Sequence, residues 1–271
     1  MHTDALIPAL FVSHGSPMLA LEPGQTGPAL TRHGEHLKAI GVQAVVVMSP
    51  HWMSDLPAVM THPAPETWHD FGGFPQELYR LQYPAPGSPA LAEAVLQRLA
   101  QAGIAAVADG RRPFDHGAWV PLGFLFPQAD VPVVQLSLPV HAGPADVYAL
   151  GQALRDLRGK GILLMGSGSM THNLQEFFGG RPEREAPAAA YVSAFSRWVE
   201  GVLLAGDRDR LFDYRRQAPE AVRAHPTDEH FLPLFFALGA ANWGVEGGPL
   251  PEYLVREVSY RYLAMDALSL Q

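Results

Sequence analysis

The chain has 271 residues, of which 48% are hydrophobic and 17% are charged, so it carries enough apolar material for a large core and is not a disordered chain. Its 19 Lys and Arg stand against 27 Asp and Glu, a net charge of −8. This balance argues against a general binder of nucleic acid or anionic membranes, since both need clustered positive charge. The absence of cysteine excludes disulfides, thiolate metal sites and a cysteine nucleophile. Any metal must therefore be held by His, Asp or Glu.

No apolar run approaches the roughly 18 residues that a membrane-spanning helix needs. The first apolar run has no basic region before it and is interrupted by Pro8, so no signal peptide is predicted. We therefore expect the protein to act in the cytoplasm.

Five short apolar runs, rich in Val, Ile and Leu and with little polar alternation, predict strands that are buried on both faces of a sheet. They span 7–12, 44–48, 104–107, 131–136 and 162–165. The stretch 57–89 is rich in proline but also contains Trp68, Phe71 and Phe74, which a flexible linker would not need. We predict that this stretch is one long ordered excursion of the kind that often carries function.

Helical patterns separate the predicted strands. Helices are predicted at 90–102, 145–158, 187–204 and 231–241. The first of them has Ser88 as a predicted N-cap, Pro89 in its first turn and Gly103 as its end. The alternation of strands and helices predicts an α/β fold, with a central, mostly parallel sheet flanked by helices and a single domain over residues 1–271.

Three of the predicted strands run into a short turn of small residues that contains a histidine. His14 follows the first strand, His51 the second and His172 the fifth. In open α/β sheets the strand ends form the ligand crevice. If these strands are parallel neighbours, the three imidazoles converge at one edge of the sheet. Neutral imidazole is the commonest protein ligand for borderline metals, so this pattern favours a metal site.

Two further groups could join such a site. Near the start of the last predicted helix, either Glu229 or His230 could complete the ligand set. Because adjacent side chains usually point in different directions, we expect one ligand here rather than two. Asp115, next to His116, could orient an imidazole.

The segment 166–168 reads Gly-Ser-Gly, but no lysine follows it at the spacing of a phosphate-binding loop. We expect a turn there, followed by a helix that Asn173 caps, with Glu176 three residues later. The sequence has no G-x-S-x-G elbow, so a serine nucleophile is not predicted.

Seven motifs, taken together and in order, resemble the class III extradiol ring-cleavage dioxygenases, and most closely the 4,5-DOPA extradiol dioxygenases. The motifs are HGSP at 14–17, HW at 51–52, HDFGGFP at 69–75, YPAPGSP at 83–89, DHGAW at 115–119, HNL at 172–174 and PTDEH at 226–230. The resemblance extends from about Leu10 to Leu263. One motif alone would be weak evidence, but seven in register are specific.

The resemblance implies a mononuclear metal site in an α/β fold. His14, His51 and His230 match the metal ligands. His172 matches the active-site histidine beside the metal, which acts as an acid–base or as an additional ligand. His116 matches a second active-site histidine that contacts substrate or oxygen.

The resemblance also indicates which residues contact the substrate and which metal the site holds. Substrate contacts are expected from His69, Phe71, Gly72, Gly73 and Asp115. The better-known members hold Fe(II) with two histidines and a carboxylate. An all-histidine site suits Zn(II) as well as Fe(II). We expect one divalent metal per chain, with Fe(II) required for dioxygenase activity and Zn(II) as the alternative.

The predicted activity is the opening of the aromatic ring of a DOPA-like catechol by O2. Two alternatives stay open at this point: a zinc-dependent hydrolase on the same fold, and a non-catalytic homologue that binds a metal or a ligand. The expected partners are a catechol and O2, without nucleic acid or membrane, in a monomer or a small homo-oligomer.

Overall fold

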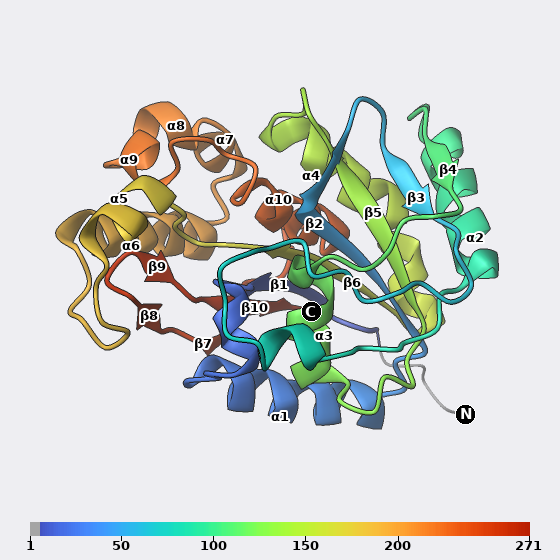
Figure 1. Ribbon diagram of the computed structural model, residues 1–271. Helices are drawn as coiled ribbons and strands as arrows, with labels where there is room; N and C mark the ends of the chain where they lie inside the picture. The colour runs from blue at the N-terminus through green and yellow to red at the C-terminus, as the bar shows by residue number, and fades with distance from the viewer. Residues whose placement is uncertain (1–5) are drawn as a thin grey trace.

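An eight-stranded sheet runs through the middle of the structure, a computed structural model that describes residues 6–271 (Figure 1). The strand order is β4-β3-β5-β2-β6-β1-β10-β7. The strands are β1 (Ala9–Ser13), β2 (Ala44–Ser54), β3 (Ala58–Met60), β4 (Val107–Asp109), β5 (Val133–Pro139), β6 (Ile162–Gly168), β7 (Glu252–Val255) and β10 (Ala267–Leu270). A separate two-stranded ribbon joins β8 (Val258–Ser259) and β9 (Leu263–Ala264).

The centre of the sheet is parallel. Strands β5, β2, β6 and β1 follow one another in parallel register. Beyond β1 the sheet continues with antiparallel β10 and β7, and beyond β5 with antiparallel β3, which pairs in parallel with β4. The three strands predicted to carry histidines, β1, β2 and β6, are therefore parallel neighbours. That is the arrangement required for the imidazoles to converge.

Helices cover both faces of the sheet (Figure 1). One face carries α1 (Thr26–Ala39) and α3 (His116–Leu125), and the other carries α2 (Pro89–Gln101), α4 (Pro144–Leu154) and α10 (Leu232–Ala240). The remaining helices are α5 (Leu174–Gly180), α6 (Ala190–Ala205), α7 (Arg208–Phe212), α8 (Tyr214–Gln217) and α9 (Ala221–Ala224), with 3-10 segments at Pro17–Ala20, Leu78–Arg80 and Arg155–Lys160.

The alternation of side chains along β2 divides the apolar core into two layers. Val45 and Val47 pack in the cluster under α1 and α3, whereas Val46 and Met48 pack in the cluster under α4 and α10. Both sets are fully buried, as expected for a strand with helices on both sides. The predicted α/β fold with a helix-flanked sheet is therefore confirmed. Within residues 6–271, no helix combines the length and the apolar character needed to cross a bilayer.

The local predictions hold best where the sequence has strong signals for the start and end of a helix. The predicted helix at 90–102 is α2, with Pro89 in its first turn and Ser88 accepting a hydrogen bond from the Leu91 N–H. The strand predicted at 104–107 is misplaced, because β4 begins only at Val107, where the chain first pairs with β3. The turn predicted at 166–168 is wrong, since these residues form the end of β6.

Asp266, just before β10, carries a buried carboxyl group that makes stability depend on pH. It is 6% exposed, and burial raises its pKa to about 7. Arg256 lowers this pKa and Glu200 raises it, both by less than burial does. The unfolded chain ionises this group near pH 4, so raising the pH from about 4 to 7 favours unfolding. We expect wild type to lose about 2–3 kcal/mol relative to Asp266→Asn between pH 5 and pH 8. Urea unfolding at both pH values measures this, and a constant difference between the two proteins would contradict it.

Candidate metal centre and active site

Five histidine side chains meet at the edge of the sheet where β1, β2 and β6 end. Between ring centroids, His14 lies 5.0 Å from His51 and 5.4 Å from His230. His51 lies 4.0 Å from His116, and His172 stacks on His230 at 3.5 Å. The convergence expected from the strand ends is therefore observed, and it includes the histidines of two further segments.

A bulge in β2 sets the position of His51. Between Met48 and Met53, four residues of β2 lie opposite a single residue of β5, Ser137. Such a bulge bends the strand and redirects its side chains, and bulges are common next to active sites. The apolar run at 44–48 predicted the strand before this point, but not the extension of β2 to Ser54 through the bulge.

His230 is brought to the sheet by two glycines at the end of β6. A methyl group on Gly168 would overlap the carbonyl oxygen of His230, and one on Gly166 would overlap that of Pro233. The backbone at the start of α10 can therefore lie directly against the strand. The Ser169 N–H donates a 2.7 Å hydrogen bond to the His230 carbonyl and fixes this contact. The Gly-Ser-Gly segment thus serves close packing, and it is not a phosphate loop.

The hydrogen bonds of His14 define its tautomer. The Ser167 hydroxyl donates to the carbonyl oxygen of Gly117, so its oxygen must accept from the Nδ1 of His14, 3.0 Å away. The proton of the neutral His14 ring is then on Nδ1, and the Nε2 lone pair is free. This Nε2 lies 3.0 Å from the Nε2 of His51.

This spacing fits two ligands of one metal ion. Nitrogens bound at about 2.1 Å and about 90° apart lie about 3.0 Å from each other. His14, His51 and His116 each offer a nitrogen within 4.8 Å of the others, so this buried group can hold one metal ion. A second group with the same spacing consists of His172, Glu229 and His230.

Two carboxylates orient two of the imidazoles. Asp70 accepts hydrogen bonds of 2.9 Å from both the Nδ1 and the backbone N–H of His116, the first residue of α3. Glu229 accepts one of 2.9 Å from the Nδ1 of His230. In each ring the carboxylate places the proton on Nδ1 and leaves Nε2 free. This arrangement is typical of metal-binding histidines.

The environment keeps these imidazoles neutral. Burial, reinforced by the neighbouring rings, lowers the pKa of His14 and that of His230 well below the usual value. Burial also lowers the pKa of His51 and that of His172 to about 4. Burial alone would raise the pKa of Asp70, but its hydrogen bond with His116 pulls it below the usual value. At neutral pH the site therefore offers neutral imidazoles beside an ionised carboxylate, which suits a divalent cation.

Four of these histidines, His51, His116, His172 and His230, line a cavity of about 310 Å³. Its walls are mainly apolar and come chiefly from three segments: the turn after β1, the loop between β3 and the 3-10 segment Leu78–Arg80, and α5. The lining consists of Gly15, Ser16, Pro17, His51, Phe71, Gly72, Gly73, Phe74, His116, His172, Leu174, Phe177, Phe178, His230 and Leu263. Phe71, Gly72 and Gly73, from which substrate contacts were expected, are thus among the residues that line the cavity.

His69 and Asp115 do not line this cavity, so a direct substrate contact is not supported for either. The Nε2 of His69 lies 3.1 Å from the carbonyl of Leu81. Asp115 is completely buried, where it caps α3 and forms a 2.7 Å ion pair with Arg112. The neighbouring Asp70, present in the same motif as His69, is the residue that orients His116, and sequence reasoning did not assign it.

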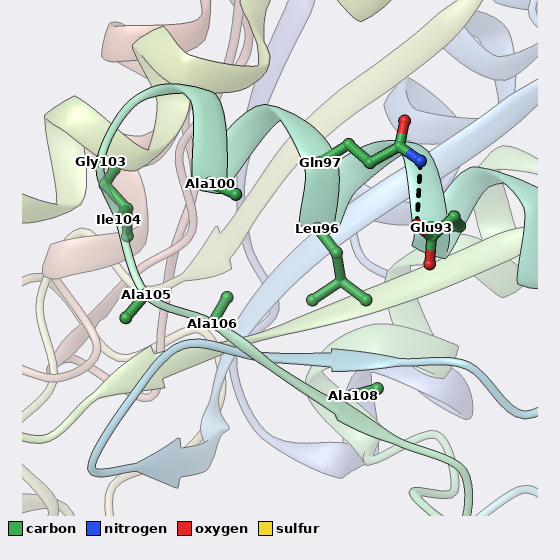
Figure 2. Close-up of a pocket in the computed structure, with 9 residues that line it drawn as sticks. All are labelled: Glu93, Leu96, Gln97, Ala100, Gly103, Ile104, Ala105, Ala106 and Ala108. Carbon is green, nitrogen blue, oxygen red and sulfur yellow. Dashed lines mark hydrogen bonds between the residues drawn. The ribbon is translucent and has the colours of Figure 1, made fainter.

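A larger but open hollow lies between α2 and the segment that leads to β4 (Figure 2). It has a volume of about 640 Å³ and is lined by small and apolar side chains such as Leu96, Ala106 and Ala108, together with a Glu93–Gln97 hydrogen bond. Among its lining residues there is no histidine and no pair of carboxylates. Its size therefore does not make it a competing reaction site.

Comparison with known proteins agrees with the geometry. Residues 8–263 match the family described as the catalytic LigB subunit of aromatic ring-opening dioxygenase. The chain is 40% identical to 4,5-DOPA dioxygenase extradiol of Beta vulgaris over 88% of each chain. It is 38% identical to the protein of the same name from Escherichia coli, over 86% of this chain and 85% of that one. The crystal structure of an uncharacterised Escherichia coli protein superimposes with a TM-score of 0.78 at 31% identity, covering 98% of this chain and all of that one.

The fold and the histidine cluster thus define an enzyme of the aromatic ring-opening class. The chain belongs to the LigB family, the class III extradiol dioxygenases, as its seven motifs predicted. The prediction of an extradiol dioxygenase is confirmed at this level, and the hydrolase and the non-catalytic homologue are not favoured.

The carboxylate of Asp70 provides a test of how the imidazoles are oriented. Asp70→Asn keeps an oxygen that can accept from His116 but removes the charge, which also lies 3.7 Å from the Nδ1 of His51. Because this charge faces His51, a ligand candidate, we expect metal affinity to fall by about tenfold, the lower end of the range for groups that orient ligands. Competition with a chelator measures this. Asp109→Asn is the control, because the Asp109 carboxylate accepts a hydrogen bond from the backbone N–H of Arg111 in a loop. An equal loss of metal affinity in both variants would refute the role of Asp70.

Proposed function

We propose that the chain holds one Fe(II) ion through His14, His51 and His230 and opens the ring of catechols with O2. Both oxygen atoms enter the product, so that no external reductant is needed. The observation that carries this proposal is the 3.0 Å distance between the Nε2 atoms of His14 and His51. His51 also lines an apolar cavity large enough for an aromatic ring.

For the third ligand we favour His230 over Glu229. The Glu229 carboxylate accepts a hydrogen bond from His230, so that it orients the ring and leaves Nε2 for the metal. The ring of His230 is as far from His14 as that of His116, at 5.4 Å, so the geometry admits it. The family resemblance assigns the ligand position to His230.

The donor set fits a divalent metal, because His14, His51 and His116 each bring a ligand nitrogen within 4.8 Å of the others, and the ring of His230 lies beside them. Bound there, Fe(II) would lower the pKa of a catechol hydroxyl and supply the electron transfer that O2 chemistry needs, which redox-inactive Zn(II) does not. His14, His51 and His230 would hold the ion beside the cavity. The apolar walls exclude water from the bound ring.

For His172 we favour proton transfer over metal binding. Its ring stacks on that of His230 with an interplanar angle of 11°. The lone pairs of two parallel, stacked rings run side by side and do not point at one atom. His172 is neutral at pH 7, because burial lowers its pKa to about 4, and it borders the cavity. We assign to it the acceptance and return of a catechol proton.

His116 is the second group that faces substrate. Its Nδ1 is fixed by Asp70, and its ring lies 5.6 Å from that of Phe71 in the cavity wall. Its remaining nitrogen can therefore contact the substrate or oxygen from a defined direction. We assign to it this positioning contact.

The test is anaerobic reconstitution with Fe(II), followed by an oxygen-uptake screen over substituted catechols. The proposal predicts one O2 consumed per catechol and a yellow ring-opened product. Uptake that yields hydrogen peroxide with an intact ring, or no uptake with any catechol, would contradict it. The Zn(II)-loaded protein serves as the redox-inactive control.

A further inference from the structure

Arg112 contacts the backbone of His51 but does not line the cavity. Its guanidinium packs on the rings of Trp52 and Trp68, with the central carbon 4.9 and 5.0 Å from the two ring centroids. The side chain is only 11% exposed. A planar guanidinium held on aromatic rings loses little further freedom when it donates hydrogen bonds, so it can fix the position of its acceptors.

The acceptors of Arg112 are a backbone carbonyl and a buried carboxylate. Its Nη2 donates to the carbonyl oxygen of His51 at 3.0 Å and to the carboxylate of Asp115 at 2.7 Å. These two bonds use both hydrogens of Nη2. Arg112 is therefore engaged within the protein, and its absence from the cavity lining sets it apart from the groups that face substrate.

The backbone of His51 needs such a contact, because it lies in the bulge of β2. Neither β5 nor β6 has a residue in register with His51. Side chains satisfy its two backbone polar groups instead. The His51 N–H donates to the hydroxyl oxygen of Ser49 at 3.3 Å, and the His51 carbonyl accepts from Arg112. The position of the imidazole thus depends on these two side chains more than on the sheet.

Asp115 joins the two side chains that hold His51. Its carboxylate is completely buried and accepts from the Ser49 hydroxyl at 2.8 Å, from Arg112, and from the side-chain amide of Gln135. A buried charge is tolerated when it is paired and its oxygens are hydrogen-bonded, and Asp115 meets both conditions. The network of Ser49, Arg112 and Asp115 is therefore closed on itself.

The same carboxylate fixes the start of α3. Asp115 accepts a hydrogen bond from the Ala118 N–H at 3.2 Å, and His116 is the first residue of the helix. A methyl group on Gly117 would lie 2.9 Å from the Cδ2 of His51, so only glycine lets α3 approach the bulge this closely. One buried carboxylate thus ties the backbone of His51 to the helix that carries His116.

We propose that Arg112 is a positioning residue for the metal ligand His51. Together with Ser49, and joined to it by Asp115, it holds the His51 backbone so that the imidazole reaches the metal. This rests on the proposed function, which takes His51 as a ligand. The effect is one of geometry more than of charge. Burial is the largest influence on the pKa of His51, and among the smaller ones Asp115 raises this pKa while Arg112 lowers it, so their charges oppose each other.

Arg112→Lys tests the proposal, because it keeps the charge but its ammonium ends one bond short of the Nη2 position and has no planar fork. We expect the affinity for Co(II), measured by competition with a chelator, to fall about tenfold. The visible absorption bands of bound Co(II) should also shift, because they depend on the number and arrangement of the ligands. The proposal requires both changes, and the absence of either would overturn it.

Arg256→Lys is the matched control for this substitution. Arg256 also stacks on a ring, that of Tyr253, and forms an ion pair with Glu200, but it has no hydrogen bond to a histidine of the cluster among the described residues. We expect its Co(II) affinity to stay within about twofold of wild type, with an unchanged spectrum. A loss equal to that of Arg112→Lys would show a general effect of such substitutions and overturn the proposal.

The same substitution in a His51→Ala background separates positioning from an effect on the whole site. If Arg112 acts through His51, Arg112→Lys should change the residual Co(II) affinity of His51→Ala by less than about twofold. A further loss as large as in wild type would overturn the proposal. These measurements need no turnover. If the Fe(II)-loaded protein consumes no O2 with any catechol, the proposed function fails, while the Co(II) affinities still decide the role of Arg112.

Ser49→Ala covers the case in which Arg112→Lys does not fold. It removes the other side chain that joins His51 to Asp115 but keeps the ion pair of Arg112 and Asp115, so it leaves no unpaired charge in the core. We expect the loss of one neutral hydrogen-bonding group to lower the Co(II) affinity by about threefold. Circular dichroism checks the fold of both variants. If Arg112→Lys is unfolded, a Co(II) affinity of Ser49→Ala equal to that of wild type would overturn the proposal.

Discussion

Replacing His14, His51 or His230 singly with alanine is expected to empty the metal site. Each removes one of three ligands, and losing even the partner of a ligand typically lowers affinity 10- to 100-fold, so that we expect a loss of more than about 100-fold. After reconstitution and gel filtration, elemental analysis should find about one metal per chain in wild type and almost none in these variants. Circular dichroism should show an unchanged fold, because the three side chains lie at the sheet edge.

His116→Ala is the informative companion to these three variants. It alters a histidine whose nitrogen lies within 4.8 Å of those of His14 and His51, yet our assignment predicts that it keeps the metal. A metal-free His116→Ala together with a fully loaded His230→Ala would move the third ligand to His116. It would also leave the stacked pair of His172 and His230 as substrate-facing groups.

The second large effect is expected at His172. His172→Ala should retain about one metal per chain but lose about 10²- to 10⁴-fold in kcat, the usual contribution of a general acid–base. Steady-state oxygen uptake with a good catechol measures the rate, and elemental analysis of the same sample measures the metal. The matched control is Leu174→Ala, two residues further along and in the cavity wall, which should change KM more than kcat.

An equal loss of metal in His172→Ala would show that this histidine is a ligand. Full activity in the variant would show that protons leave the catechol by another route. In both cases the proton-transfer assignment would be withdrawn, and in the second the stacking on His230 would serve packing alone.

The sequence predicted the central part of the site because its signals are local. His14, His51 and His172 each follow an apolar strand, and parallel neighbouring strands bring their ends together. The fold class followed from the same alternation of strands and helices. The cap at Asn173, which accepts from the N–H of Glu176, was also predicted from residues only three apart.

Features that depend on long-range packing were not accessible in this way. The bulge that places His51 depends on the register between β2 and β5. The approach of His230 depends on two glycines in β6, some sixty residues earlier, which were interpreted as a turn. Whether His69 or Asp70 contacts the histidine cluster depends on which side of their loop faces α3. Their order in the sequence, side by side, carries no such information.

The wall of the cavity shows the same limit. Phe177 and Phe178 lie on α5, a helix of seven residues that is too short for a clear hydrophobic periodicity. Their role becomes visible only when α5 is seen beside the histidines. The composition of this part of the wall therefore comes from the structure, whereas the reaction class was already indicated by the motifs.

Anomalous X-ray diffraction from crystals of the metal-loaded protein tests the central claim most directly. The account predicts one peak per chain, about 2.0–2.2 Å from nitrogen atoms of His14, His51 and His230. A peak elsewhere, two separate peaks, or a peak bound by His14 and His51 without His230 would contradict it.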